Sequence, residues 1–283
     1  STVRLDGAPV RDAILAGLAG RISGAGNPAV CLATVLVGDD GPSRRYVASK
    51  HRTAGEIGIR SVGVELPATA TQAQVEAEVA RLATDASVHG ILVQMPLPGH
   101  LDPERVLALI PAAKDVDGLT EASLGRLVRG VPGHVGCTPL GVMRLLDHYG
   151  IATSGRRAAV IGRSTLVGLP MALLLAQKGV DATVTLAHSR TADMVAVCRE
   201  ADIIVSATGI ARSITAAHVK PGAAVIDVGI SRTDAGIVGD VDFDAVQGVA
   251  GAVTPMPGGT GLLTVACLME NTVAAAAMQG VRV

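Results

Sequence analysis

The sequence predicts an α/β protein of two domains, in which helices pack on buried parallel sheets. Short apolar runs alternate with segments of helical periodicity along almost the whole chain, as in strand–helix–strand units with right-handed crossovers. Hydrophobic residues make up 49% of the chain, yet only two tyrosines and one phenylalanine are aromatic, and 34 glycines accompany abundant alanine. Small side chains suit helices that pack closely on a parallel sheet.

The first series of strands is predicted within residues 1–137. Its strands are CLATVLVG, RSVGVEL and HGILVQM, at residues 31–38, 60–66 and 89–95. Helices are expected between them, in segments that contain VASKHRTAGEIG and QAQVEAEVARLAT, because apolar residues recur there at helical spacing. This series predicts an N-terminal α/β domain.

A second series is predicted within residues 138–261. Its strands are expected at residues 156–162, 181–188, 201–209, 223–230 and 248–255. Helices such as LPMALLLAQKG separate them. The alternation predicts a doubly wound parallel sheet.

The glycine- and proline-rich stretch VRGVPGHVGCTP lies between the two series, as domain boundaries often do. Thr138 offers an N-cap and Pro139 a first-turn proline for a helix in LGVMRLLDHY, which we interpret as a hinge. The last helix, in LLTVACLMENTVAAAAM, could return to either domain; we expect residues 262–283 to complete the first.

The composition excludes several classes of function. A formal net charge of −1 and the lack of aromatic stacking residues argue against nucleic-acid binding. The charges in STVRLDGAPVRDAILAG do not fit a signal peptide, and no apolar run reaches transmembrane length. We therefore expect a soluble, cytoplasmic protein.

The four cysteines are Cys31, Cys137, Cys198 and Cys267, with no CxxC motif and no histidine at ligand spacing. Scattered cysteines of this kind favour buried, reduced thiols over a zinc site or a disulfide framework. No metal site is predicted.

VIGRSTLVGLP, residues 160–170, lies where a strand of the second series turns into a helix. Gly162 and Gly168 permit a tight turn, and a helix N-terminus offers free N–H groups to a phosphate. The G-x5-G spacing is a weak motif, and a plain strand–helix turn is the alternative. However, a plain turn needs no Arg163 and Ser164 at its apex.

HSRT, residues 188–191, ends the next strand, where a doubly wound sheet places the adenosine ribose of a dinucleotide. An acidic residue there would favour NAD. Ser189 and Arg190, with Arg163 nearby, favour the 2′-phosphate of NADP instead. A solvated basic loop is the alternative interpretation.

Candidate chemistry in the first domain centres on SRRYVASKHR, residues 43–52. In a helix, Tyr46 and Lys50 would share one face; the alternative is a charge-rich, solvated helix. Gln94 emerges from an apolar strand, which is costly unless its amide is paired. KDVDG places Asp115 and Asp117 in a turn that could equally be a solvated loop, and TPMPGGTG (254–261) can bring backbone close to a ligand.

These segments together resemble the bifunctional methylenetetrahydrofolate dehydrogenase/methenyltetrahydrofolate cyclohydrolase family. The resemblance runs from about residue 30 to the C-terminal helix. It rests on YVASK, GILVQMPLP, KDVDG, CTP, VIGRSTLVGLP, HSRT, PGAAVIDVGISR, GDVDF and TPMPGG, in that order. The series of motifs is specific, although each motif alone is weak.

The resemblance implies a catalytic folate-binding first domain, a Rossmann-like NADP-binding second domain and an interdomain cleft. Tyr46 would stack on the p-aminobenzoyl ring, Lys50 would carry the cyclohydrolase chemistry, Gln94 would orient Lys50, and Asp117 would hold the pterin. We expect Arg44, Arg45 and Arg52 to help lower the pKa of Lys50. The other predicted substrate contacts are Val93, Met95, Pro257, Gly258, Gly259 and Gly261. The predicted cofactor contacts are Gly162, Arg163, Ser164, Ser189, Arg190, Thr208, Gly209 and Ile230.

One loop departs from the family pattern PGGVGPMT, because this chain has PGGTGLLT. Thr260 replaces a valine, and Leu262 replaces a proline, which frees φ and restores an N–H group.

The implied activity is NADP-dependent oxidation of 5,10-methylenetetrahydrofolate, followed by hydrolysis to 10-formyltetrahydrofolate, in a homodimer of one-carbon metabolism and purine biosynthesis. A reductase of the shikimate dehydrogenase type and a non-catalytic dinucleotide- or folate-binding regulator are the alternatives.

Overall fold

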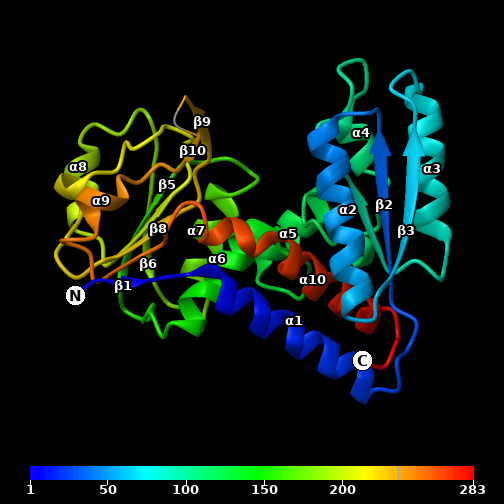
Figure 1. Ribbon diagram of the computed structural model, residues 1–283, viewed down its shortest axis with the longest axis horizontal. Coiled ribbons are helices and arrows are strands. Elements are labelled where there is room, and N and C mark those ends of the chain that lie inside the picture. Colours follow the sequence, from blue (N-terminus) through cyan, green and yellow to red (C-terminus); the bar gives the residue numbers. More distant parts are fainter. Residues whose placement is uncertain (235) are drawn as a thin grey trace. The chain divides into compact units, whose positions relative to one another are not determined.

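The computed structural model describes residues 1–234 and 236–283 (Figure 1). The chain forms two compact units, each built from two separate stretches of sequence. The small-sheet unit comprises Ala13–Cys137 and Val265–Val283, and the large-sheet unit comprises Ser1–Asp12 and Thr138–Thr264.

The small-sheet unit contains a parallel sheet in the order β3-β2-β4. Its strands are β2 (Cys31–Val37), β3 (Arg60–Leu66) and β4 (Gly90–Val93). Every residue of β2 and β4 is buried, as expected for a continuous apolar run in a parallel sheet. The three strands were predicted from the sequence at these places.

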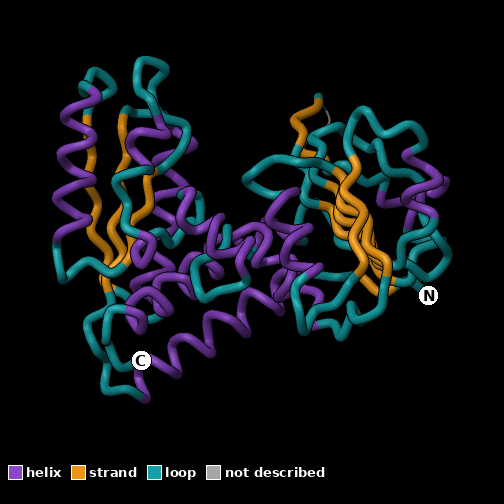
Figure 2. Tube along the Cα trace, turned by 180° about the vertical axis from the view of Figure 1, so that it is seen from behind, coloured by secondary structure: helices purple, strands orange, loops and turns teal. Residues whose placement is uncertain are grey.

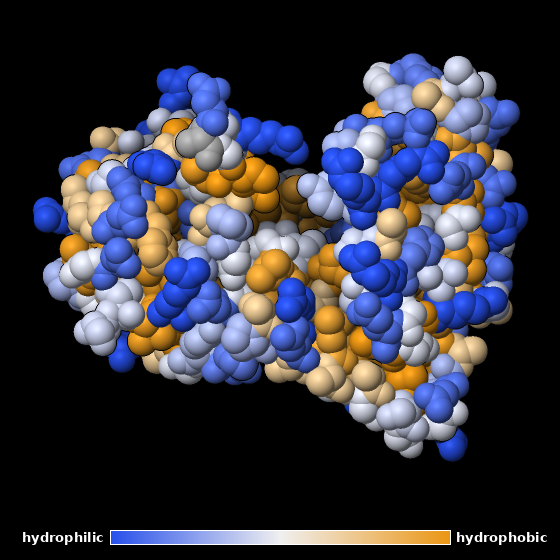
Figure 3. Space-filling model, viewed as in Figure 1, coloured by the Kyte–Doolittle hydropathy of each residue, from blue (hydrophilic) through white to orange (hydrophobic). Residues whose placement is uncertain are grey.

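The helices of this unit begin at clear capping signals. α2 (Gly41–Glu56) is capped by Asp40, which accepts a hydrogen bond from Ser43 N at 2.9 Å, and α3 (Gln72–Thr84) begins with a capping box of Thr71 and Gln74. The shorter helices are α4 (Pro103–Leu107), η1 (Ala112–Lys114) and α5 (Glu121–Arg129). Figure 3 shows hydrophilic side chains over the part of the unit where Figure 1 labels α2.

The last helix, α10 (Thr264–Met278), packs in the small-sheet unit except for its first residue. Asn271 Nδ2 donates to Val116 O and to Val135 O, both at 2.9 Å. The helix therefore holds the KDVDG turn, at Val116, together with the later backbone at Val135.

The large-sheet unit contains six parallel strands in the order β1-β11-β8-β7-β5-β6. They are β1 (Val3–Arg4), β5 (Arg157–Ile161), β6 (Thr183–Ala187), β7 (Ile203–Ser206), β8 (Ala224–Asp227) and β11 (Ala252–Val253). Figure 2 shows the twist of this sheet. After β5 the chain adds β6 on one side and β7 on the other, so the strand order reverses next to β5.

The remaining elements of this unit surround the sheet. The helices are α6 (Cys137–His148), α7 (Gly168–Ala176), α8 (Met194–Arg199), η2 (Ala216–His218), α9 (Phe243–Val246) and η3 (Thr260–Leu262). A separate antiparallel pair consists of β9 (Ser231–Thr233) and β10 (Gly236–Val238).

The structure corrects the predicted first domain at its N-terminus. β1 pairs in parallel with β11, Val3 opposite Ala252, and Ser1–Asp12 therefore belong to the large-sheet unit. The division between the units falls within α1 (Gly7–Gly24). Two-residue strands carry no periodicity, so β1 was not predicted. α6 begins at Cys137, which places Thr138 inside the helix, not at its predicted N-cap.

No helix among residues 1–234 and 236–283 is both long and apolar enough to cross a membrane. All four cysteines are buried free thiols, as the sequence predicted.

Candidate functional site

Lys50 and Gln94 form the centre of a site in the small-sheet unit. Lys50 Nζ donates to Gln94 Oε1 at 2.8 Å. The other end of the amide is also held, because Gln94 Nε2 donates to Met95 O at 2.9 Å. Gln94 directly follows β4, so the end of the strand fixes the acceptor that orients the lysine.

Tyr46 lies four residues before Lys50 on α2 and is 57% exposed. The buried residues of this helix are Ser43, Val47 and Ala54. The tyrosine ring is therefore not part of the side of the helix that packs against the core. An exposed aromatic ring beside a half-buried amine can stack on a flat ligand. Val93 is buried at the end of β4, and Met95 is half-buried beyond Gln94.

The two carboxylates of the KDVDG turn have different surroundings. Asp115 is buried and accepts hydrogen bonds from Thr120 N at 2.9 Å, Thr120 Oγ1 at 2.7 Å and Ser123 Oγ at 2.6 Å. These contacts fix the start of α5. Asp117, in contrast, lies near Lys50: burial raises the pKa of Asp117 to about 6, and the charge of Lys50 opposes that rise.

The pKa of Lys50 is lowered, and burial is the main cause, while Asp117 acts in the opposite direction. The predicted contribution of the arginines is wrong. Arg44, Arg45 and Arg52 are exposed, and Arg44 is paired with Asp39 and with Glu65, the latter at 3.3 Å. Exposed guanidinium groups are screened by water, and none of the three arginines is among the causes of the lowered pKa of Lys50.

Cys137 is a neighbour that the sequence interpretation did not connect with this site. Its Sγ lies 3.9 Å from Asp117 Oδ1 and 3.7 Å from Val116 O. Burial, followed by the charge of Asp117, raises the pKa of the thiol well above its usual value. The CTP string contained this residue, but nothing in its spacing linked it to KDVDG.

A cavity of about 590 Å³ lies in the large-sheet unit at the carboxyl ends of β5, β6 and β7. This is where the strand order reverses, and ligands of open α/β sheets bind at such points. Of the predicted cofactor residues, Gly162, Arg163, Ser164, Ser189 and Thr208 line it. Arg190, Gly209 and Ile230 are exposed and are not among its lining residues. His188, Met194, Ile214 and His218 line it without having been predicted.

The turn after β5 suits a phosphate-bearing ligand. Gly162 has φ of 114°, and a Cβ there would overlap the carbonyl of Ala207, so the turn requires glycine. Ser164 Oγ accepts a hydrogen bond from Val167 N at 3.1 Å, just before α7 begins. Arg163 is exposed beside the helix N-terminus, and both features favour an anion. The residues present therefore fit a dinucleotide phosphate.

The PGGTGLLT loop belongs to the large-sheet unit and follows β11. At both positions that depart from the family pattern, the additional hydrogen-bond donor has an acceptor. Thr260 is buried and its Oγ1 donates to Asp227 O at 2.9 Å, and Leu262 N donates to Gly259 O at 3.2 Å. The hydroxyl and the restored N–H are therefore paired. Pro257 and Gly261 are exposed, whereas Gly258 is half-buried and Gly259 buried.

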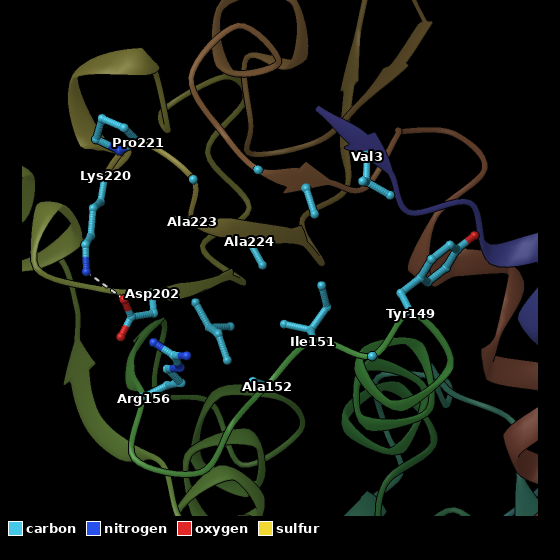
Figure 4. Close-up of a pocket in the computed structure, with 15 residues that line it drawn as sticks. Val3, Tyr149, Ile151, Ala152, Arg156, Asp202, Lys220, Pro221, Ala223 and Ala224 are labelled. Carbon is cyan, nitrogen blue, oxygen red and sulfur yellow. Dashed lines mark hydrogen bonds and ion pairs between the residues drawn. The ribbon is translucent and has the colours of Figure 1, made fainter. Parts of the chain in front are cut away.

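A second cavity, of about 410 Å³, lies at the other end of the strands of the large sheet (Figure 4). Ile203 and Ala224, which begin β7 and β8, line it. The ammonium group of Lys220 there is 2.6 Å from Asp202 Oδ1. This cavity is at the amino ends of the strands, so it lacks the helix N-termini that recognise a dinucleotide.

The position of the larger cavity and its glycine turn place the protein in the class of α/β dinucleotide-binding proteins. The chain belongs to the tetrahydrofolate dehydrogenase/cyclohydrolase family: the model of the family's catalytic domain matches residues 5–117, and the model of its NAD(P)-binding domain matches residues 136–280. The resemblance and the fold class predicted from the sequence are confirmed.

Individual relatives agree with this assignment. The bifunctional protein FolD of Methanoculleus marisnigri is 52% identical over 249 residues, which cover 88% of this chain and 87% of the relative. The crystal structure of the FolD dehydrogenase/cyclohydrolase of Campylobacter jejuni has a TM-score of 0.94 at 41% identity and covers 98% of this chain and 99% of its own. The Trypanosoma brucei enzyme, solved with NADP cofactor and inhibitor, has a TM-score of 0.89 at 38% identity, with 98% of both chains covered.

Proposed function

We propose that this protein is an NADP-dependent methylenetetrahydrofolate dehydrogenase and methenyltetrahydrofolate cyclohydrolase. It oxidises 5,10-methylenetetrahydrofolate to the 5,10-methenyl cation and hydrolyses that cation to 10-formyltetrahydrofolate. The observation that carries this proposal is the half-buried Lys50, whose Nζ donates to Gln94 Oε1 at 2.8 Å, in a chain of this family that also has a dinucleotide cavity. A reductase of the shikimate dehydrogenase type is not favoured, because the relatives of about 50% identity are bifunctional FolD proteins.

The two units take different parts of the reaction. The folate-binding catalytic domain corresponds to Ala13–Cys137 with Val265–Val283, and the NADP-binding domain to Thr138–Thr264 with the first twelve residues. NADP supplies the hydride acceptor. Gly162 and Ser164 would hold the phosphates, Arg163, Ser189 and the neighbouring exposed Arg190 would recognise the 2′-phosphate, and Thr208 would flank the rest of the cofactor.

The folate is bound and oriented by residues around Lys50. Tyr46 stacks on the aromatic ring between the pterin and the glutamate, and Asp117 accepts hydrogen bonds from the pterin edge. Gln94 fixes the lysine, with Val93 and Met95 beside it. The remaining substrate contacts are Pro257, Gly258, Gly259 and Gly261.

Hydrolysis requires a base, because water must lose a proton as it adds to the methenyl carbon. Burial lowers the pKa of Lys50, which increases the fraction of neutral amine near pH 7. The lone pair of Nζ takes the proton, and Gln94 Oε1 keeps the amine in place. The positive charge of the substrate is neutralised as the carbinolamine forms. The bond from the one-carbon unit to N5 then breaks, the hydroxyl oxygen becomes the formyl oxygen as it loses its proton, and N5 takes up a proton.

Steady-state assays with methylenetetrahydrofolate and NADP test the function directly. We expect formation of reduced NADP and then loss of the methenyl absorbance faster than in buffer. A folded protein that binds either ligand but forms no product would instead be a regulator, and the proposal would be wrong.

We further propose a cytoplasmic homodimer in one-carbon metabolism that provides formyl groups for purine biosynthesis, without nucleic-acid partners. The near-neutral net charge of −1 supports the last point. The β9–β10 pair supports the dimer, since it lies outside the six-stranded sheet, Ile237 on it is 50% exposed, and short exposed strands can pair with another copy. A monomeric mass by light scattering would contradict the dimer.

A further inference from the structure

Two buried aspartates in the large-sheet unit have no part in the chemistry described so far. Asp227 ends β8 and is 3% exposed; Asp240 follows β10 and is 0% exposed. A buried carboxylate is costly unless hydrogen bonds satisfy it. Their hydrogen bonds run to the loops that follow β7 and β8.

Asp240 holds the loop that follows β7. Its Oδ2 accepts from Ser206 Oγ at 2.8 Å, from Thr208 N at 2.7 Å and from Thr208 Oγ1 at 2.9 Å. The backbone of Asp240 also holds this loop, because Ile214 N donates to Asp240 O at 2.9 Å. Thr208 and Ile214 are also lining residues of the dinucleotide cavity, so Asp240 fixes one wall of that cavity from behind.

Asp227 in turn holds Asp240. Asp227 Oδ1 accepts from Asp240 N at 3.0 Å and from Gly229 N at 2.9 Å, and Oδ2 accepts from Val241 N at 2.9 Å. The carboxylate at the end of β8 therefore fixes both the turn after β8 and the backbone that carries the second carboxylate.

Two glycines make room for this arrangement in a reciprocal way. A Cβ on Gly229, beside Asp227, would overlap the carboxylate of Asp240, and a Cβ on Gly239, beside Asp240, would overlap the carboxylate of Asp227. Asp240 Oδ1 is buried without a hydrogen-bond partner in the part of the chain that the structure describes. Burying an unpaired oxygen costs free energy, so stability alone does not account for a carboxylate here.

We propose that Asp240 is a positioning residue for NADP, which sets the Thr208 loop as a wall of the cofactor cavity and is itself kept in place by Asp227. This inference rests on the proposed function, in which that cavity binds NADP.

The test compares Asp240→Ala with Asp240→Asn. Alanine leaves the Ser206 and Thr208 donors without their acceptor, and we expect the Kd for NADP, measured by calorimetry, to rise at least tenfold, together with the KM for NADP. In Asp240→Asn the amide oxygen can take the place of Oδ2, and the amide nitrogen can occupy the unpaired Oδ1 position. We therefore expect Asp240→Asn to bind NADP within about threefold of the parent. Cyclohydrolase turnover, which depends on Lys50 in the other unit, should stay within twofold in both.

A stability control separates positioning from a general loss of packing. Val246→Ala removes buried side-chain volume from the core of the same unit and should lower Tm without changing NADP affinity. If Val246→Ala weakens NADP binding as much as Asp240→Ala does, the positioning role is wrong. If Asp240→Ala does not fold, Ser206→Ala, which removes one donor, should raise the Kd about threefold, and an unchanged Kd would overturn the inference.

The outcomes distinguish this inference from the proposed function. NADP binding by Asp240→Ala with the affinity of a binding-competent parent would overturn the inference alone. Failure of the parent itself to bind NADP would overturn the proposed function, and the inference with it.

Discussion

Asp117 in the small-sheet unit and Asp227 in the large-sheet unit are both carboxyl groups whose pKa is raised to about 6, although Asp117 is half-buried and Asp227 is buried. Burial is the main cause in each case, but the hydrogen bonds differ. Three backbone N–H groups donate to Asp227. Asp117 is near the charge of Lys50 and contacts the weakly polar thiol of Cys137 at 3.9 Å.

The comparison shows that a shifted pKa does not by itself mark a catalytic group. Asp227 uses its oxygens within the fold, so its carboxylate stabilises two loops. Asp117 keeps acceptor capacity beside an amine, which is the arrangement expected of a group that meets a ligand. The predictions below test whether that division between structural and ligand-binding carboxylates holds.

The largest effect is expected at the amine beside Asp117. Lys50→Met retains most of the stem and removes the ammonium group, so cyclohydrolase turnover should fall about a hundredfold or more, as on removal of a general base. Dehydrogenase activity should fall less, because hydride transfer needs no enzyme base, and NADP affinity should be unchanged. The decisive measurement is loss of methenyltetrahydrofolate absorbance, corrected for the spontaneous reaction.

Lys178→Met is the matched control, since Lys178 is exposed in the large-sheet unit. It should leave both activities as in the parent. Gln94→Ala should resemble a milder Lys50→Met, because it removes the acceptor that orients the amine. Parent-like hydrolysis by Lys50→Met would show that Lys50 is not the base.

Replacing each aspartate by asparagine should separate the two carboxylates. Because the folded pKa of Asp117 is above its ordinary value of 3.8, its contribution to the free energy of unfolding is fully present below about pH 4 and is lost as the pH rises through about 6. The loss amounts to up to about 3 kcal/mol. Asp117→Asn should therefore gain stability relative to the parent between pH 4 and 7.5, while its folate affinity falls. Urea unfolding at several pH values, with folate titrations, measures both.

Asp227→Asn should gain less stability than Asp117→Asn. The same linkage applies, because the pKa of Asp227 is also raised to about 6, but an amide nitrogen would face one of the three backbone N–H donors, which costs about 1–3 kcal/mol. Folate affinity should be unchanged. Equal stability changes in the two variants would remove the distinction drawn above.

Cofactor preference should show a smaller effect. Arg163, Ser189 and Arg190 favour a 2′-phosphate, and we expect kcat/KM for NADP to exceed that for NAD at least tenfold, equivalent to about 1.4 kcal/mol. Arg163→Gln, at the cavity lining, should reduce this ratio, and Arg199→Gln, on an exposed position of α8, should not. Equal efficiency of the parent with both cofactors would contradict the assignment.

The smallest effect is expected at the loop that departs from the family pattern. Thr260→Val restores the usual residue but removes the hydrogen bond to Asp227 O, so the free energy of unfolding should fall by about 1 kcal/mol. Both activities should be retained. A large loss of turnover would show that the threonine hydroxyl is needed in the reaction, not only in the loop.

The sequence predicted the parts of the fold that have strong local patterns. β2 is a fully buried apolar run, β5 is buried after its first residue, and α2 and α3 have amphipathic periodicity. Lys50 and Gln94 were connected through the resemblance, and the structure shows their hydrogen bond. Their separation of 44 residues has no local signal.

Other features depend on contacts that a linear pattern does not contain. Asp227 and Asp240 stood in motifs noted only for the resemblance, and their reciprocal fit with glycines appears only when the loops are folded. The basic residues around Tyr46 suggested an electrostatic effect on Lys50, whereas burial by the surrounding fold is the main cause. β1 was missed because two residues have no period.

The pairing of β1 with β11 has a consequence for synthesis of the chain. Val3 lies opposite Ala252, so a ribosome must add about 250 residues between the two partners. At roughly 5–20 residues per second, this takes on the order of 10–50 s. During that time the N-terminal strand has no partner at its final place, and its unpaired backbone is available to chaperones or to neighbouring nascent chains. The edge of the large sheet therefore closes only after residues 252 and 253 have been made.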